Sequence, residues 1–214
     1  MKKTILTALL AIILTVPVFG ANIIQTAPNG AAVRTVGTYQ VGNDITIYRL
    51  PNKNSMILYR VRWNEDEFFP SEIGAENFFS LLIPAKNLAR VNVVDITEDW
   101  VEIVYDNKTG KTGWIRNDDL YKFMTWTNFY SAYGKKYGLK MLKGVPACAK
   151  DLKSAPDDKS QTLATINVPQ KIHLNLIQGN WMLISVMDLD KIPKTGYVRW
   201  RSDDGVRYFY PDIR

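Results

Sequence analysis

The strongest constraint on the fold of this chain is a pattern that occurs twice. In the first copy, a β-prone segment begins at Trp100 and is followed, after a polar turn, by Gly-Trp-Ile-Arg at 113–116. In the second copy, a segment that begins at Trp181 is followed by Gly-Tyr-Val-Arg at 196–199. Copies of one motif form the same supersecondary unit, so an internal repeat determines the architecture. The sequence therefore predicts two copies of one small β domain.

The repeat extends upstream of each tryptophan. Short segments at 91–93 and 172–174 alternate apolar and polar residues, which is typical of a half-buried strand. Earlier still, residues 50–55 and 155–160 each carry proline at the second position, as turns often do. Each copy is therefore predicted to run in the order turn, strand, Trp-initiated strand, hairpin and Gly-aromatic strand.

Two further positions follow from this pairing of the copies. Ile103 and Ile184, three residues after each tryptophan, are predicted to face the core. Glycine is costly inside a strand unless the backbone bends or another group approaches closely. Gly113 and Gly196 are therefore predicted to be points of close approach.

The copies differ by an insertion. The proline and the tryptophan are 49 residues apart in the first copy and 25 in the second, which places about 24 extra residues at roughly 62–86. Residues 70–82 are predicted to form a helix with Ser71 as its N-cap. One face of that helix would carry Ile73, Phe78, Leu81 and Leu82. We expect the insertion either to carry function, as long structured insertions often do, or to cover one open end of a small barrel.

The segment between the copies, 126–145, is too aromatic for a flexible linker. Trp126, Phe129, Tyr130 and Tyr133 follow helical spacing and predict a short helix before Gly134 that packs the two domains together.

The two ends of the mature chain carry turn signals. At the C-terminus, 199–211 is predicted to be a hairpin around Asp204-Gly205. At the N-terminus, 22–43 is weakly patterned, with a turn at Asn29-Gly30 and an edge strand within 32–41.

The N-terminus predicts export. Lys2 and Lys3 precede an apolar run over 5–18, and small residues follow at 20 and 21, which together indicate a signal peptide over 1–20. A membrane anchor is the rival interpretation, but the run falls short of the roughly 20 residues that a spanning helix needs. We therefore expect a periplasmic or extracellular protein with no membrane span after cleavage.

Four segments result from these boundaries: a signal peptide at 1–20, a first domain at 21–125, a connecting segment at 126–145 and a second domain at 146–214.

The hydrophobic content of 46% suits a folded protein. The net charge is +6, or +4 without Lys2 and Lys3, which is a mild excess that favours no nucleic-acid partner. The single cysteine, Cys148, excludes a disulfide framework and is predicted to be buried.

The repeated motif resembles the end of the bacterial SH3 domain, a family common in exported cell-wall proteins. The matching residues are 99–101 and 111–115 in the first copy, and 180–181 and 195–198 in the second. The resemblance implies an all-β chain of two tandem small SH3-like β-barrels. It also implies a binding function, since SH3-like folds bind extended peptides in grooves lined by aromatic residues.

The sequence predicts no catalytic, metal or cofactor site. Cys148 and His173 are the only cysteine and histidine, too few for a zinc site, and His173 is predicted to lie partly exposed within a strand. A phosphate-binding glycine loop and a serine-nucleophile elbow are also missing.

The predicted binding surface is aromatic, because tyrosine and tryptophan combine a large apolar body with a polar tip. The candidate binding residues are Tyr48, Trp63, Trp114, Tyr197 and Trp200. The expected partner is a cell-wall peptide, a glycan or another envelope protein.

Two other functions remain open at this stage. One is a small cell-wall hydrolase that uses Glu65, Asp66 or Glu67 in the insertion, since glycosidases need paired carboxylates. The other is an envelope scaffold in which the aromatic connecting segment mediates oligomers. The oligomeric state is not predicted.

Overall fold

The computed structural model describes residues 24–25, 34–167, 170–187 and 192–213. The predicted signal peptide and the predicted turn at Asn29-Gly30 lie outside these residues. None of the helices within the described ranges is long and apolar enough to cross a bilayer.

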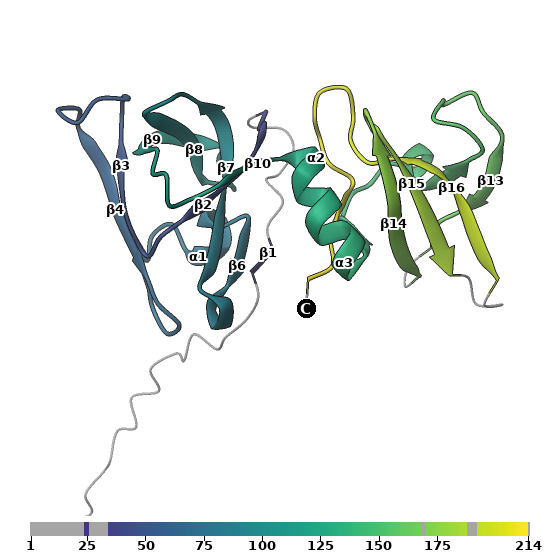
Figure 1. The fold of residues 1–214 in the computed structure, drawn as a ribbon, viewed down its shortest axis with the longest axis horizontal. Helices are drawn as coiled ribbons and strands as arrows, with labels where there is room; N and C mark the ends of the chain where they lie inside the picture. The colour runs from purple at the N-terminus through teal and green to yellow at the C-terminus, as the bar shows by residue number, and fades with distance from the viewer. Residues whose placement is uncertain (1–23, 26–33, 168–169, 188–191, 214) are drawn as a thin grey trace, which may run out of the picture.

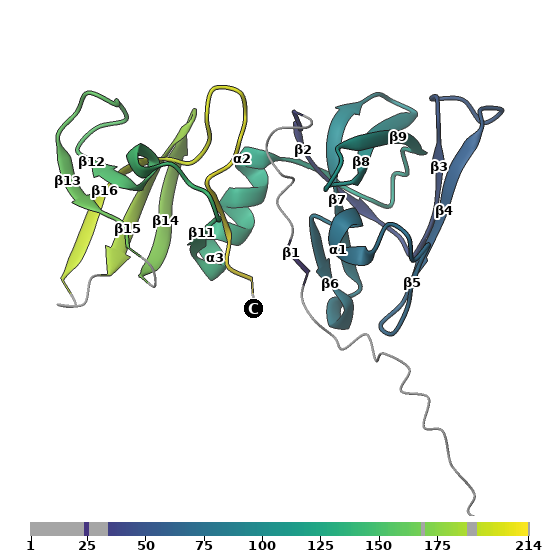
Figure 2. The same cartoon turned by 180° about the vertical axis from the view of Figure 1, so that it is seen from behind.

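The chain is mostly β and forms two antiparallel sheets with a helical segment between them (Figures 1 and 2). The first sheet contains β1 (Ile24–Gln25), β2 (Gly37–Val41), β3 (Asp44–Tyr48), β4 (Ile57–Trp63), β5 (Phe68–Phe69), β6 (Leu81–Ile83), β7 (Leu88–Ile96), β8 (Trp100–Asp106), β9 (Lys111–Arg116) and β10 (Phe123–Thr125). The second contains β11 (Leu139–Met141), β12 (Asp151–Lys153), β13 (Thr162–Thr165), β14 (Lys171–Gln178), β15 (Trp181–Met187), β16 (Pro193–Arg199) and β17 (Phe209–Pro211). The helical elements are α1 (Ala75–Phe78), η1 (Pro84–Lys86), α2 (Trp126–Phe129), the π-helix η2 (Tyr130–Gly134), α3 (Lys135–Tyr137) and η3 (Ala147–Lys150).

The two sheets share one topology. Neighbouring strands in the first sheet follow the order β4-β3-β9-β8-β7-β2-β10, and those in the second follow β13-β12-β16-β15-β14-β11-β17. Each strand of one series corresponds to a strand of the other, in the same sequence order. The first sheet adds β5, α1, β6 and η1 between β4 and β7, where the longer first copy has its extra residues. The repeat in the sequence is thus matched by a repeat in the strand order.

The register also repeats. Trp100 lies opposite Arg116 in the β8–β9 hairpin, as Trp181 lies opposite Arg199 in the β15–β16 hairpin. The proline-containing turns are closed alike: the Leu50 amide donates to Ser55 Oγ at 3.0 Å, and the Ala155 amide donates to Ser160 Oγ at 3.3 Å. Equivalent residues of the two copies therefore occupy equivalent places in the two sheets.

The predicted close approach at the two glycines is confirmed. A Cβ atom on Gly113 would lie 2.6 Å from a methyl carbon of Ile47, and one on Gly196 would lie 2.7 Å from Cγ of Leu152. The predicted core residue opposite each glycine, Ile103 or Ile184, is fully buried.

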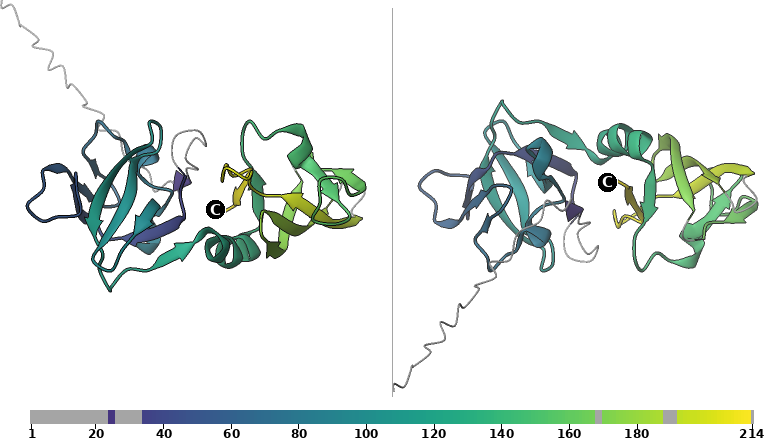
Figure 3. Two further views of the ribbon diagram at one scale, coloured as in Figure 1. Left: turned by 90° about the horizontal axis from the view of Figure 1, so that it is seen from above. Right: turned by 90° about the horizontal axis from the view of Figure 1, so that it is seen from below.

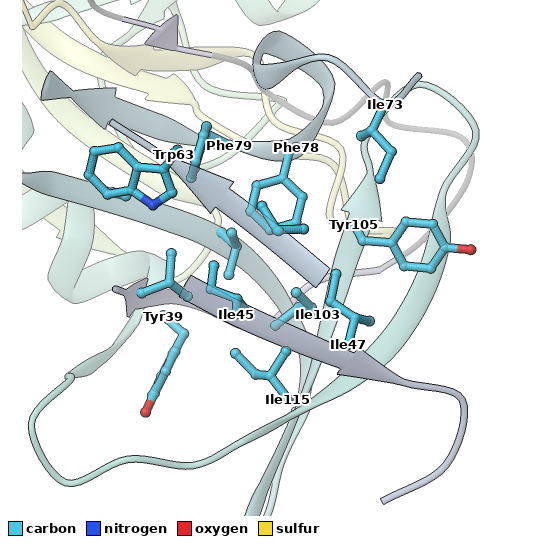
Figure 4. Close-up of a cluster of buried hydrophobic side chains, with 14 of the residues drawn as sticks. Tyr39, Ile45, Ile47, Trp63, Ile73, Phe78, Phe79, Ile103, Tyr105 and Ile115 are labelled. Carbon is cyan, nitrogen blue, oxygen red and sulfur yellow. The ribbon is translucent and has the colours of Figure 1, made fainter. Parts of the chain in front are cut away.

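The predicted all-β class is confirmed, and the chain forms two antiparallel sheets, neither of which closes into a barrel. The first sheet branches at β7, which pairs with β6, β8 and β2. The second sheet ends at β13 and β17, and these strands do not pair with each other. Trp63, Phe78 and Phe79 belong to the buried core of the first half (Figure 4), and Phe129 and Tyr130 of the helical segment belong to that of the second.

The insertion differs from its prediction. Its helix covers only Ala75–Phe78, is preceded by Gly74 rather than capped by Ser71, and ends at Phe79, whose backbone is extended. Leu81 and Leu82, predicted to share one face of the helix, are both buried and lie in strand β6, which pairs with β7. A strand replaces the helix because β6 continues the ladder of β7 beyond the end of β8.

The insertion also joins the two halves. Leu81 and Ile83 belong to the core of the second sheet, although β6 belongs to the first. The hydroxyl of Tyr210 on β17 donates to the carbonyl of Ser80 at 2.9 Å. Both side chains are buried, so this contact lies inside the junction.

The predicted helix in the connecting segment is confirmed as the run α2, η2 and α3, which lies against the second sheet (Figure 3). Trp126, Phe129 and Tyr130 are buried in the second core. The Trp126 indole also donates to the Thr35 carbonyl at 3.1 Å, before the first sheet. Strand β11 begins at Leu139, so part of the connecting segment belongs to the second sheet.

Three local predictions are corrected. Cys148 is exposed, because the turn η3 buries Ala149 instead. Strand β2 is not an edge strand, since it pairs with both β7 and β10. Residues 199–211 reverse direction as predicted, but the hairpin is limited to one bridge between Arg201 and Arg207, and β17 pairs with β11.

Replacing Gly113 by alanine should destabilise the fold by about 1–3 kcal/mol, because the new methyl group collides with Ile47. Chemical denaturation measures the change. Lys111→Ala, at an exposed position on the same strand, is the control and should change stability by about 0.5 kcal/mol or less. Equal stability of Gly113→Ala and the parent would contradict the close packing described above.

Tyr210→Phe should cost about 1–2 kcal/mol, because it leaves the buried Ser80 carbonyl without this donor. The control is Tyr208→Phe, a half-buried position two residues earlier, with an expected change of about 0.5 kcal/mol or less. Thermal and chemical unfolding should both detect the difference, and identical behaviour of the two variants would argue against the junction contact.

Candidate functional site

The repeated hairpin places its polar and aromatic residues on the outer face of each sheet. Val101 and Ile103 of β8 belong to the first core, so the alternation of a strand places Trp100 and Glu102 on the opposite face, where Trp100 is itself buried beneath its neighbours. By the same alternation, Ile115 of β9 faces the core, and Trp114 and Arg116 face outward. Ile45 and Ile47 of β3 place Tyr48 on that outer face as well.

These side chains form a connected group, which we call the first aromatic face: Tyr48, Trp100, Trp114 and Arg116. The guanidinium carbon of Arg116 lies 5.1 Å from the ring centre of Trp100, within the range of a cation–π contact. The Tyr48 ring meets the Trp100 ring edge-on, with centres 5.5 Å apart and an interplanar angle of 89°. Trp114 lies opposite Tyr48 across β9 and β3.

A groove of about 230 Å³ adjoins the first aromatic face and includes Tyr48 and Arg116 in its lining. Two more rings, Tyr39 and Tyr121, and two carboxylates, Asp44 and Asp118, complete its polar and aromatic walls. The groove therefore offers one cation, two carboxylates and several aromatic rings within a small volume.

The aromatic wall is held in place by Tyr39. Its hydroxyl accepts a hydrogen bond from the backbone amide of Asp118 at 2.8 Å, and burial raises the pKa of the phenol. The Tyr121 ring packs edge-on against it, with ring centres 6.5 Å apart. The groove wall is thus preformed by contacts within the protein.

The second sheet carries an equivalent group, the second aromatic face: Trp181, Tyr197 and Arg199. The Arg199 guanidinium lies 5.3 Å from the Trp181 ring centre, almost as Arg116 lies on Trp100. Arg199 also donates to both carboxylate oxygens of Asp158, at 2.8 and 3.3 Å, and to Asp203 at 2.9 Å. Two carboxylates thus neutralise its charge.

The ion pairs of Arg199 with Asp158 and Asp203 shift the pKa values of these groups. The hydrogen bond to Asp158 raises the pKa of Arg199, and the hydrogen bond from Arg199 lowers the pKa of Asp203. The side chain of Arg199 is 24% exposed.

The first face lacks these carboxylates. The residue equivalent to Asp158 is Lys53, and the residue four positions after Arg116 is Leu120. The Arg116 side chain is 43% exposed, and its ion pair with Asp99 spans 3.8 Å. Arg116 is therefore accessible to a ligand, whereas its counterpart in the second sheet, Arg199, is neutralised by Asp158 and Asp203.

The predicted binding residues divide into two groups. Tyr48 and Trp114 lie together on the first aromatic face, and Tyr197 lies on the second, opposite Lys153. Trp63 and Trp200 do not belong to a surface, because each indole is buried.

Both buried indoles donate to a backbone carbonyl. Trp63 donates to Gly42 at 2.8 Å, and Trp200 donates to Gly179 at 3.0 Å. We therefore remove these two tryptophans from the candidate site.

Trp100 and Arg116 were missed as site residues. A signal for them existed, since tryptophan and arginine recur at the same places of both copies. Their pairing across the hairpin, however, depends on the strand register, which the turn length sets.

The carboxylates of the hydrolase alternative lie elsewhere. Glu65, Asp66 and Glu67 are exposed in the turn between β4 and β5, and none lines the groove. The amides of Asp66 and Glu67 are held by the side-chain oxygen of Asn64 at 2.8 and 2.7 Å. Their arrangement is that of a solvated turn.

Other reactive side chains are also separate. His173 is exposed on β14, as predicted, and Cys148 is exposed in η3. Within the described part of the chain, no group of three or more histidine, cysteine, aspartate or glutamate residues is placed to hold a metal ion.

No family model matches this chain, and comparison with characterised proteins and with solved structures finds no similar protein.

Asp203→Asn should lower the melting temperature at neutral pH and have no effect in strong acid. The pKa of Asp203 is lowered by Arg199, so its contribution is present above the ordinary carboxyl pKa of about 3.9 and is lost as the pH falls through the folded-state value. Melting curves from pH 7 to about pH 2 measure this convergence. Asp204→Asn, one residue along the exposed turn, is the control, and a pH-independent difference would contradict the assignment.

Proposed function

We propose that this protein is an exported, non-catalytic binding protein with two related SH3-like modules, and that the first module binds a carboxylate-bearing cell-wall peptide. The shared strand order and the repeated Trp and Gly-aromatic motifs support two modules of one kind. The contrast between Arg116 and Arg199 is the observation that carries the ligand assignment.

A carboxylate fits the first aromatic face because arginine presents a planar fork of donors that matches it. Arg116 lies over Trp100 and borders the groove, so its position is set before a ligand arrives. In the second module Arg199, which lies on Trp181, already donates to the carboxylates of Asp158 and Asp203. An arginine in this position on a tryptophan ring can therefore bind carboxylates. The ligand would supply in the first module what Asp158 and Asp203 supply in the second.

A peptide fits the groove better than a neutral glycan. The groove has a cation at Arg116 and a carboxylate at Asp118, which complement a ligand with both charged ends; its other carboxylate, Asp44, is paired with Arg62 at 3.3 Å. Rings of Tyr39, Tyr48 and Tyr121 provide apolar contact between them. An extended peptide offers charged groups of both signs along with apolar side chains.

The other functions gain no comparable support. The carboxylates proposed for hydrolysis lie in an exposed turn away from the groove. The aromatic residues proposed for oligomer contacts, Trp126, Phe129 and Tyr130, are buried in the second core of the same chain.

Arg116→Gln should weaken binding of a soluble cell-wall peptide with a free carboxylate by about tenfold, through loss of a charge-assisted hydrogen bond. Isothermal titration calorimetry measures the affinity. Amidation of the peptide carboxylate should weaken binding to the parent by a similar factor and have little further effect on Arg116→Gln. Arg60→Gln, an exposed arginine on β4, is the charge-matched control.

Trp114→Ala should also weaken this binding, and Tyr197→Ala, its counterpart in the second module, should not. Far-UV circular dichroism checks that both variants fold. Equal losses for Trp114→Ala and Tyr197→Ala, or equal affinity of the amidated and free peptides for the parent, would refute the assignment of the first module.

A further inference from the structure

A second and larger cleft, of about 730 Å³, lies beside the second sheet. The cleft is lined by residues of α3, β11 and β14 and by Ile166, Asn167 and Gln170; β11 pairs with β14, and α3 and β14 are neighbours in the fold (Figure 1). A volume of this size is typical of sites for small molecules. The residues of the first aromatic face do not contribute to it.

The cleft is strongly basic. Lys136, Lys140 and Lys171 line it, and Asp212 is the one carboxylate among its described lining residues. Lys136 and Lys171 are exposed. His173 adds an exposed imidazole on the same strand as Lys171.

The insertion of the first copy contributes a further cation near this cleft. Lys86 Nζ, at the end of η1, lies 5.9 Å from the ring centre of Tyr137, and Lys136 Nζ lies 5.1 Å from the same centre. Tyr137 lines the cleft and stacks on Tyr133 at an interplanar angle of 14°. A hydrogen bond from Lys136 and the charges of Lys136 and Lys86 lower the pKa of the Tyr137 phenol, which reflects the positive potential there.

The equivalent position in the first copy has a structural role. Since 91–93 matches 172–174, Lys171 corresponds to Arg90. Arg90 is buried and donates to the Thr38 hydroxyl at 2.8 Å and to the Lys122 carbonyl at 2.9 Å. Lys171 faces solvent in the cleft instead, so its charge is available to a ligand.

Lysine ammonium groups act as point charges, and several of them can surround a phosphate group, which carries charged oxygens on more than one side, without the planar fork through which arginine pairs with carboxylate or phosphate. The cations lining this cleft are lysines, and arginine is absent from its described lining. We propose that this cleft binds a phosphate-bearing ligand through Lys136 and Lys171, with Tyr137 beside the phosphate.

Calorimetric titration of the purified protein with sodium tripolyphosphate tests the proposal. Saturable binding is expected, with about tenfold weaker affinity for the double variant Lys136→Gln/Lys171→Gln. Lys108→Gln/Lys159→Gln removes the same charge from exposed turns and should change affinity less than about twofold. Amide NMR shifts should fall on 136–141 and 170–173 in the parent.

A second arm distinguishes a soluble phosphate from a lipid head group. Vesicles of phosphatidylglycerol and of phosphatidylcholine are sedimented with the parent and both double variants. Tripolyphosphate binding that depends on Lys136 and Lys171 supports a soluble ligand, and selective retention on phosphatidylglycerol with the same dependence supports a lipid phosphate. Failure in both arms, or equal losses in the two double variants, overturns the proposal.

Discussion

The hairpin that carries the repeat is the element on which the rest of the structure depends. Its register places tryptophan opposite arginine at one end and isoleucine opposite glycine near its middle, in both copies. A slip of one strand by one residue would exchange the core and outer faces of that strand. The isoleucine would then leave the core, and the arginine would leave the tryptophan ring.

The glycine in this hairpin connects it to the next strand. At Gly113 and Gly196 the lack of a side chain allows β3 and β12 to approach and pair with the hairpin. That approach positions Tyr48 beside Trp114 in the first module. One local packing requirement therefore also assembles part of the candidate site.

The two modules diverged around a common arrangement. In the second, Asp158 and Asp203 neutralise the arginine; in the first, Lys53 and Leu120 occupy the corresponding positions and Arg116 stays accessible. Near β7 an arginine of the first module is buried instead. The insertion contributes strand β6 beside this residue, Arg90, and Leu81 and Ile83 of that strand pack into the core of the second sheet.

The sequence predicted the features that depend on local pattern. Strand alternation, the two repeated hairpins, the close approach at two glycines and the helix after Trp126 all appear as expected, because each follows from spacing within a few residues. The insertion was harder to predict. The same apolar residues, Leu81 and Leu82, suit either a helix or a strand, and the free ladder of β7 decides between them.

The candidate site was predictable only in part, for the same reason. Aromatic content indicated a binding surface and included Tyr48 and Trp114, but it could not separate these from Trp63 and Trp200, which fill cores and bond to backbone carbonyls. By itself, the sequence determined that the chain contains two copies of one β unit, because periodicity and turn chemistry are local. The tertiary structure decided which arginine is neutralised and where the lysines gather, because charges far apart in sequence meet only when strands pair.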